Sequence, residues 1–170
     1  MFLRLLQGRP IRLPHSGLVT ASYGHVADLA DAMLSIVGNR TAVGEVFNVT
    51  AGAVTTRRYV EILARVVGRE PNIVPVPDER LHELPPGAYG HLFSDRHHAV
   101  LSIDKARRIL GFEPRFDIRA GHADTYQWFL SRGFDRLEGP LSDPVWRATW
   151  NFDAESAAVG TLRGLATTGA

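Results

Sequence analysis

Hydrophobic residues recur with helical spacing over residues 25–37. The apolar positions follow one another at i, i+3, i+4, i+7, i+8 and i+11, which puts them on a single helix face: Val26, Leu29, Ala30, Met33, Leu34 and Val37. The pair Gly38-Asn39 can end this helix. Residues 44–50, Gly-Glu-Val-Phe-Asn-Val-Thr, then predict a short and mostly buried strand.

The remaining apolar and polar pattern predicts several short elements. Helices are expected over residues 2–7, 56–67, 103–110 and 118–131, and proline-bounded strands over 9–14 and 72–77. Polar residues stand where helix caps are needed: Thr55 or Thr56, Ser102 and Asp117. The expected buried stripe of helix 56–67 consists of Val60, Leu63, Ala64 and Val67.

The rest of the chain is less regular. Residues 78–101 contain a possible helical turn at 78–84. The tail, 134–170, is richer in small residues, but it contains three aromatic side chains that should pack: Trp146, Trp150 and Phe152. Its last ten or so residues are expected to be loose.

Composition narrows the function classes. The chain has 170 residues, 45% of them hydrophobic, which is typical of a globular protein with a real core. A net charge of +1 gives no electrostatic footprint for nucleic acid or an anionic membrane. The absence of cysteine excludes disulfides, thiolate catalysis and zinc–cysteine sites. The apolar start is too short for an export signal or a membrane span, so a cytoplasmic location is expected.

Three phrases in order along the chain resemble one enzyme family. They are His-Val-x-Asp-Leu-Ala at 25–30 with Gly-Glu-Val-Phe-Asn-Val at 44–49, then residues 102–114, Ser-Ile-Asp-Lys-Ala-Arg-Arg-Ile-Leu-Gly-Phe-Glu-Pro, and the helix that follows to 129. This set resembles the late part of extended and atypical short-chain dehydrogenase/reductases, the NAD-dependent epimerase/dehydratase family. Residues 95–98, Asp-Arg-His-His, are similar to atypical members related to chloroplast stem-loop-binding proteins.

The resemblance implies a fold and a division of the chain. In that family about half of the protein precedes the first phrase, whereas 24 residues precede it in this sequence, so the chain is expected to be the C-terminal half. The implied fold is α/β: a partial, incomplete Rossmann edge (helix plus strand) with a small α+β substrate-binding lobe. Residues 1–133 would form the substrate-binding region and 134–170 an extension. An apolar patch near Val26, Met33, Leu34 and Phe47 would then be exposed unless a nucleotide-binding partner chain or self-association covered it.

Two motifs that the family uses for its cofactor and chemistry are missing. No Gly-x-x-G-x-x-G turn is present to let a backbone approach a pyrophosphate; Gly87-Ala88-Tyr89-Gly90 is interpreted as a turn. The only lysine, Lys105, has Leu101 four residues before it, so no Tyr-x-x-x-Lys pair exists. We therefore expect no catalytic residue, no metal and no cofactor bound by these residues alone, with NAD(P) implied only if a nucleotide-binding half is supplied.

Substrate-binding candidates come from the family's substrate region and from residue chemistry. The candidates are Arg96, His97, His98, Tyr23, Asn48 and Arg12. Arg96 is the best anion binder, because a guanidinium pairs with carboxylate or phosphate at two points. Members acting on nucleotide sugars usually carry an arginine two residues before the aromatic of the first phrase, and Ala21 stands there, so a different small polar substrate is favoured.

Structural readings compete with several of these sites. His25 and Asp28 can simply stabilise a helix start, and the Asn48 amide can satisfy a loop. His91, His97 and His98 with Asp95 could suggest a metal, but neighbouring histidines on an extended segment point to opposite sides.

Three functions follow. The first is the substrate-binding half of an NAD(P)-dependent epimerase, dehydratase or reductase, not competent for redox chemistry on its own. The second is a stand-alone ligand-binding or scaffolding module. The third is a small non-redox lyase, isomerase or cyclase that uses His97, His98 or Asp95 as acid or base. RNA binding fits the balanced charge poorly.

Overall fold

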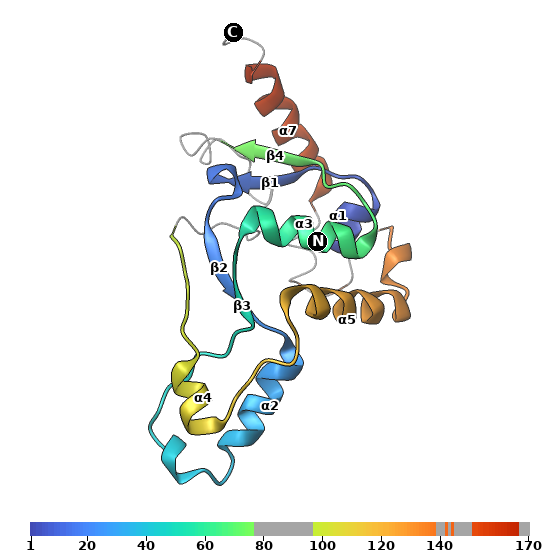
Figure 1. The fold of residues 1–170 in the computed structure, drawn as a ribbon. Coiled ribbons are helices and arrows are strands. Elements are labelled where there is room, and N and C mark those ends of the chain that lie inside the picture. The colour runs from blue at the N-terminus through green and yellow to red at the C-terminus, as the bar shows by residue number, and fades with distance from the viewer. Residues whose placement is uncertain (77–96, 139–141, 143, 145–150, 167–170) are drawn as a thin grey trace.

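Helices and short strands alternate along the chain in a computed structural model, which describes residues 1–76, 97–138, 142, 144 and 151–166 (Figure 1). The elements, in chain order, are α1 (Phe2–Leu6), β1 (Ile11–Pro14), η1 (His15–Gly17), β2 (Thr20–Tyr23), α2 (Val26–Ile36), η2 (Arg40–Ala42), β3 (Gly52–Thr55), α3 (Thr56–Val67), β4 (Ile73–Val76), α4 (Asp104–Leu110), α5 (Ile118–Ser131), η4 (Phe134–Arg136) and α7 (Phe152–Ala166).

Two of the predicted strands form a parallel pair. β1 runs beside β4 in parallel, with Ile11 opposite Ile73 and Pro14 opposite Val76. The apolar side chains of β1 pack with α1 and α3 into the largest buried cluster: Leu5, Ile11, Leu13, Val60, Leu63 and Ala64. A parallel pair covered by helices confirms the predicted α/β class.

A second, antiparallel pair was not predicted from the sequence. β2 pairs with β3, with Thr20 opposite Thr55 and Tyr23 opposite Gly52. Ala99 adds a parallel bridge on the other side of β2. Its amide donates to the Thr20 carbonyl at 2.8 Å, and its carbonyl accepts from the Ser22 amide at 2.8 Å. The segment that begins at residue 97 is therefore joined to β2.

Helix α3 confirms its predicted bounds and cap. The Thr55 hydroxyl accepts a hydrogen bond from the Arg58 amide at 3.2 Å, so Thr55 is the N-cap. Gly68 ends the helix at φ +72°, a left-handed conformation that glycine adopts without steric cost. The predicted stripe is buried, with Val67 half-buried at its end.

Helix α2 forms as predicted, but its apolar face points to solvent. The residues that α2 buries are Asp28 and Ala32. Val26 is 75% exposed, Met33 61% and Leu34 70%, and Leu29 and Val37 are exposed on the same side. We call these five residues the α2 face. The expected exposure of Val26, Met33 and Leu34 is confirmed.

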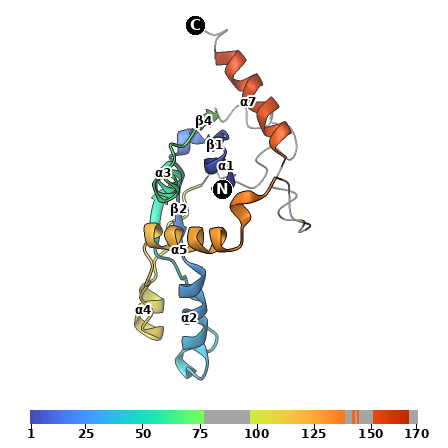
Figure 2. The ribbon, with the colours of Figure 1, turned by 90° about the vertical axis from the view of Figure 1, so that its right-hand side faces the viewer.

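The predicted strand over 44–50 is wrong. These residues are not in a strand, because a strand requires a hydrogen-bonded neighbour and the described part of the chain supplies none. Phe47, expected in the exposed patch, is half-buried against a second core cluster of Ala32, Ala106 and Phe112. This cluster joins α2 to α4, which lie side by side at one end of the elongated molecule (Figures 1 and 2).

Helix α7 lies at the opposite end of the molecule and packs on α1 and β4 (Figure 1). Arg4 and Glu155 form a buried ion pair between α1 and α7. Phe152 is buried, as predicted, and the Arg9 guanidinium lies 4.0 Å from its ring centroid. The helix continues to Ala166. Trp146, Trp150 and the possible turn at 78–84 lie outside the described residues.

None of the helices in the described ranges combines the length and the apolar character needed to cross a membrane.

Candidate functional site

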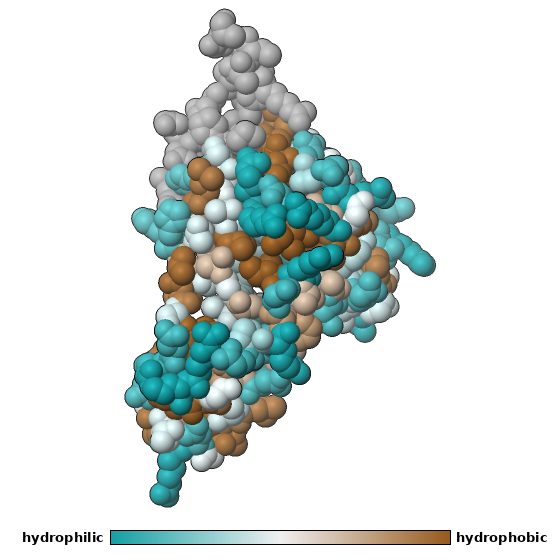
Figure 3. Space-filling view, viewed as in Figure 1, coloured by the Kyte–Doolittle hydropathy of each residue, from teal (hydrophilic) through white to brown (hydrophobic). Residues whose placement is uncertain are grey.

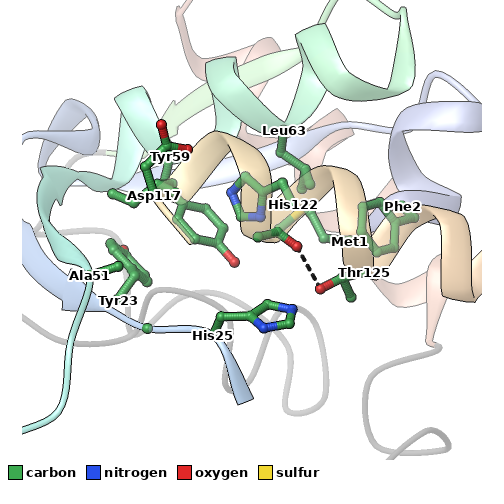
Figure 4. A pocket seen from close by; sticks show the side chains of 13 residues that line it. Met1, Phe2, Tyr23, His25, Ala51, Tyr59, Leu63, Asp117, His122 and Thr125 are labelled. Carbon is green, nitrogen blue, oxygen red and sulfur yellow. Dashed lines mark hydrogen bonds between the residues drawn. The ribbon is translucent and has the colours of Figure 1, made fainter. Parts of the chain in front are cut away.

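A pocket of about 210 Å³ opens between α1, α3 and α5, next to the chain that leads from β2 into α2. Hydrophobic residues line this part of the surface, and hydrophilic residues surround them (Figure 3). The lining residues, most of them shown in Figure 4, are Met1, Phe2, Tyr23, Gly24, His25, Ala51, Tyr59, Leu63, Asp117, Ile118, Gly121, His122 and Thr125.

Two stacked tyrosines form one wall of the pocket. The rings of Tyr23, at the end of β2, and Tyr59, on α3, lie 4.2 Å apart between centroids. Burial, together with the neighbouring Tyr59, raises the pKa of Tyr23 to about 12, and burial raises the pKa of Tyr59. Both phenols are therefore uncharged near neutral pH.

His122 of α5 carries the unusual polar atom of the site. Its ring meets the Tyr59 ring edge-on at 4.4 Å between centroids. The residue is 8% exposed, and its Nε2 atom is buried without a hydrogen-bond partner among the described residues. Burial lowers the pKa of His122 to about 4, so the imidazole is neutral at pH 7 and can either donate or accept a hydrogen bond.

Acid is expected to destabilise the protein through His122. Its pKa rises from about 4 in the fold to its ordinary value of 6.5 on unfolding, so the unfolded chain takes up the proton first. Stability is complete above pH 6.5 and falls as the pH drops towards 4, by about 2–3 kcal/mol at the acid end. Urea unfolding at pH 7 and pH 4.5 measures this loss.

The control for this prediction is a pair of histidine variants. His122→Phe should lose less of its stability in acid than the wild type, whereas His97→Phe, at an exposed position, should lose as much. Equal acid losses in the wild type and His122→Phe would contradict the assignment.

His25 is a structural residue, because both of its ring nitrogens are engaged. Nδ1 accepts a hydrogen bond from the Ala27 amide at 3.3 Å and so caps α2. Nε2 lies 3.2 Å from the Asp124 carboxylate on α5. The ring also stacks on Phe116, 4.1 Å between centroids. A histidine held in this way is not free to act as a base towards a ligand, and the capping interpretation of His25 is confirmed.

Asp28 also has a structural role, which differs from the expected stabilisation of its own helix start. The carboxylate is 2% exposed and accepts hydrogen bonds from the backbone amides of Arg115 and Phe116, each at 3.2 Å. The Arg115 guanidinium lies 3.5 Å from the same carboxylate. Asp28 therefore ties the segment before α5 to α2.

The substrate-binding candidates do not converge on one site. Tyr23 lines the pocket, whereas the Asn48 amide donates to the Ser102 carbonyl at 3.1 Å and joins two loops. His98 is exposed at the other end of β2, where its Nδ1 accepts from the Thr20 amide at 3.0 Å. His97 is exposed beside it, and Arg12 is buried in β1. Arg96, like His91 and Asp95, lies outside the described residues.

Sequence reasoning did not select Tyr59 or His122. One signal could have pointed to His122: on helix 118–131 it lies seven residues before Phe129, so both fall on one helix face. Tyr59 lies next to the buried stripe of its helix and has no comparable signal.

No protein-family model matches the chain. Several curated proteins do match, among them the following two. The chain is 37% identical over 143 residues to a chloroplast stem-loop binding protein of 41 kDa from Arabidopsis thaliana, covering 83% of this chain and 37% of that protein. It is 32% identical over 129 residues to UDP-glucose 4-epimerase from Mycolicibacterium smegmatis, covering 75% of this chain and 37% of the epimerase.

Solved structures give the same picture. An epimerase from Methanothermobacter thermautotrophicus superposes with a TM-score of 0.64 at 23% identity, over 79% of this chain and 37% of that one. A dTDP-glucose 4,6-dehydratase from Bacillus anthracis, solved with NAD, gives a TM-score of 0.58 at 25% identity, over 78% and 38%.

Over about 79% of its length, the chain therefore has the fold found in NAD-dependent epimerases and dehydratases. It spans less than two-fifths of the length of the curated relatives that it matches.

Proposed function

We propose that the chain is the substrate-side, C-terminal portion of an NAD(P)-dependent epimerase, dehydratase or reductase and that it works together with a nucleotide-binding portion. The observation that carries the proposal is the α2 face: four large apolar side chains on α2 and Val37 directly after it, with exposed fractions from 46% to 79%. An apolar surface of this kind marks an interaction site.

The cofactor is assigned to the nucleotide-binding portion because the described residues do not fit a dinucleotide. The sequence has no Gly-x-x-Gly-x-x-Gly turn, and β1 leads into η1 and β2, not into a helix N-terminus. The pocket of about 210 Å³ is below the usual range for cofactor sites. We do not propose that these residues carry out redox chemistry on their own.

Two further parts of the proposal rest on the sequence. The substrate is a small polar molecule, and Ala21, where nucleotide-sugar members usually carry arginine, argues against a nucleotide diphosphate sugar. A cytoplasmic location belongs to the same proposal. A non-redox enzyme based on His98 is less well supported, because Nδ1 of that histidine is occupied by the Thr20 amide.

The proposal predicts that the chain alone gives no saturable NADH or NADPH binding but associates with itself through the α2 face. Fluorescence titration measures the first, and sedimentation velocity on the same samples measures the second. Met33→Glu should reduce the association with little change in stability, because Met33 is already 61% exposed.

Arg65→Glu serves as the matched control, since Arg65 is exposed on α3, away from the α2 face. It should leave the association unchanged. Tight NADH binding by the chain alone would overturn the proposal, and so would self-association that Met33→Glu does not weaken.

A further inference from the structure

The pocket between α3 and α5 has flat, apolar walls. Phe2, Leu63 and the stacked rings of Tyr23 and Tyr59 surround it. In Figure 4 the imidazole rings of His122 and His25 lie on opposite sides of the open space. Walls of this kind favour a ligand that is itself a flat ring, because offset stacking adds to the burial of apolar area.

One polar atom in these walls lacks a partner. Nε2 of His122 is buried with no hydrogen bond within the described residues, a state that costs free energy unless a ligand or water pairs with it. The neighbouring polar groups are already occupied: the Thr125 hydroxyl donates to the Gly121 carbonyl at 2.8 Å, and the Asp117 carboxylate accepts from the Ala120 amide at 2.7 Å. His25 uses both of its nitrogens.

Tyr23, Tyr59 and His122, which line the pocket, carry no charge at neutral pH. Burial keeps the imidazole of His122 neutral by lowering its pKa, and it keeps the two phenols neutral by raising theirs. An anionic ligand would lose its hydration here and would face the Asp117 carboxylate, and a cation would find only that one exposed carboxylate, which already accepts from the Ala120 amide.

We propose that this pocket binds an uncharged, flat nitrogen heterocycle, whose ring N–H or ring nitrogen forms a hydrogen bond with Nε2 of His122. This site is independent of the proposed nucleotide-binding partner and goes beyond the proposed function. A pocket of about 210 Å³ suits one or two rings rather than a dinucleotide. A sugar fits less well, because its several hydroxyls would each need a partner and these walls are mostly apolar.

The test uses benzimidazole, which carries one ring N–H and one ring nitrogen and so matches either tautomer of His122. With the chain labelled in its histidines with ¹⁵N, benzimidazole at pH 8 should shift the His122 ring signals saturably. Indene, which has the same shape and no nitrogen, should bind about 10-fold more weakly, the value of one buried hydrogen bond.

Two variants separate the hydrogen bond from the shape of the pocket. His122→Phe keeps an aromatic ring in place and should bind benzimidazole and indene equally. His97→Phe, at an exposed site, should keep the preference for benzimidazole. If His122→Phe does not fold, the wild-type comparison of benzimidazole with indene decides by itself.

Three results would overturn the site: no saturable shift of His122 with benzimidazole, equal affinities for benzimidazole and indene in the wild type, or a shift of His122 by UDP-glucose in place of benzimidazole. None of these bears on NADH binding or on the α2 face, so failure of this inference is distinguishable from failure of the proposed function.

Discussion

Glu155→Gln is expected to destabilise the fold by about 3–5 kcal/mol, because it removes the buried carboxylate that pairs with the buried guanidinium of Arg4. The side chains of Arg4 and Glu155 are 5% and 3% exposed, so water cannot replace the lost carboxylate. Urea unfolding followed by circular dichroism measures the loss. α7 is the element that should detach first from α1 and β4.

An exposed ion pair provides the control. Lys105 and Glu45 lie 2.9 Å apart with more than two-fifths of each side chain exposed, and Glu45→Gln should cost less than about 1 kcal/mol. Replacing both buried partners, Arg4→Met with Glu155→Leu, should restore most of the stability, because both buried charges are then removed together. If Glu155→Gln costs no more than Glu45→Gln, the pair does not hold α7.

Asp28→Asn should cost about 3 kcal/mol. The two oxygens of Asp28 accept from two different backbone amides, those of Arg115 and Phe116. An asparagine has only one oxygen, so in either orientation its NH₂ group faces one of these amides and leaves that donor unsatisfied. Hydrogen exchange should show faster exchange of the amides of residues 115 and 116, together with those of α2.

Asp31→Asn is the matched control for this change. Asp31 lies on the same helix and also faces Arg115, at 2.5 Å, but its side chain is 52% exposed. The loss should be below about 1 kcal/mol, with normal exchange at residues 115 and 116. Similar effects of the two substitutions would show that Asp28 acts only as one more surface charge.

Helices α1 to α5 were predictable from sequence because they carry their own signals, whereas α7 was not predicted. In α3 a capping side chain, an apolar stripe and a stopping glycine agree within one short segment, and α5 begins at its predicted cap, Asp117. The strands were harder. β2, Thr-Ala-Ser-Tyr, has no alternating apolar pattern and exists through its pairing with residues 52–55 and 99. Residues 44–50 show the reverse case: their composition is typical of a strand, but no described strand lies beside them to pair with.

Periodicity also could not say which face of α2 is buried. The apolar face is the obvious choice, yet the described structure buries Asp28 and Ala32, because the first is paired to backbone amides and the second packs on Phe112. The pocket was missed for a similar reason. Tyr23, His122 and Tyr59 are far apart in sequence, and only the packing of α5 on α3 brings them together.

Two of the three core clusters in the described residues have a thermodynamic consequence. One joins α1, α3 and β1, the other joins α2 and α4, and they share no residue. Their connection runs through the β2–β3 pair and the seating of His25 on α5. Such a molecule is expected to melt as two cooperative units, each with its own midpoint, so Glu155→Gln and Asp28→Asn should shift different transitions.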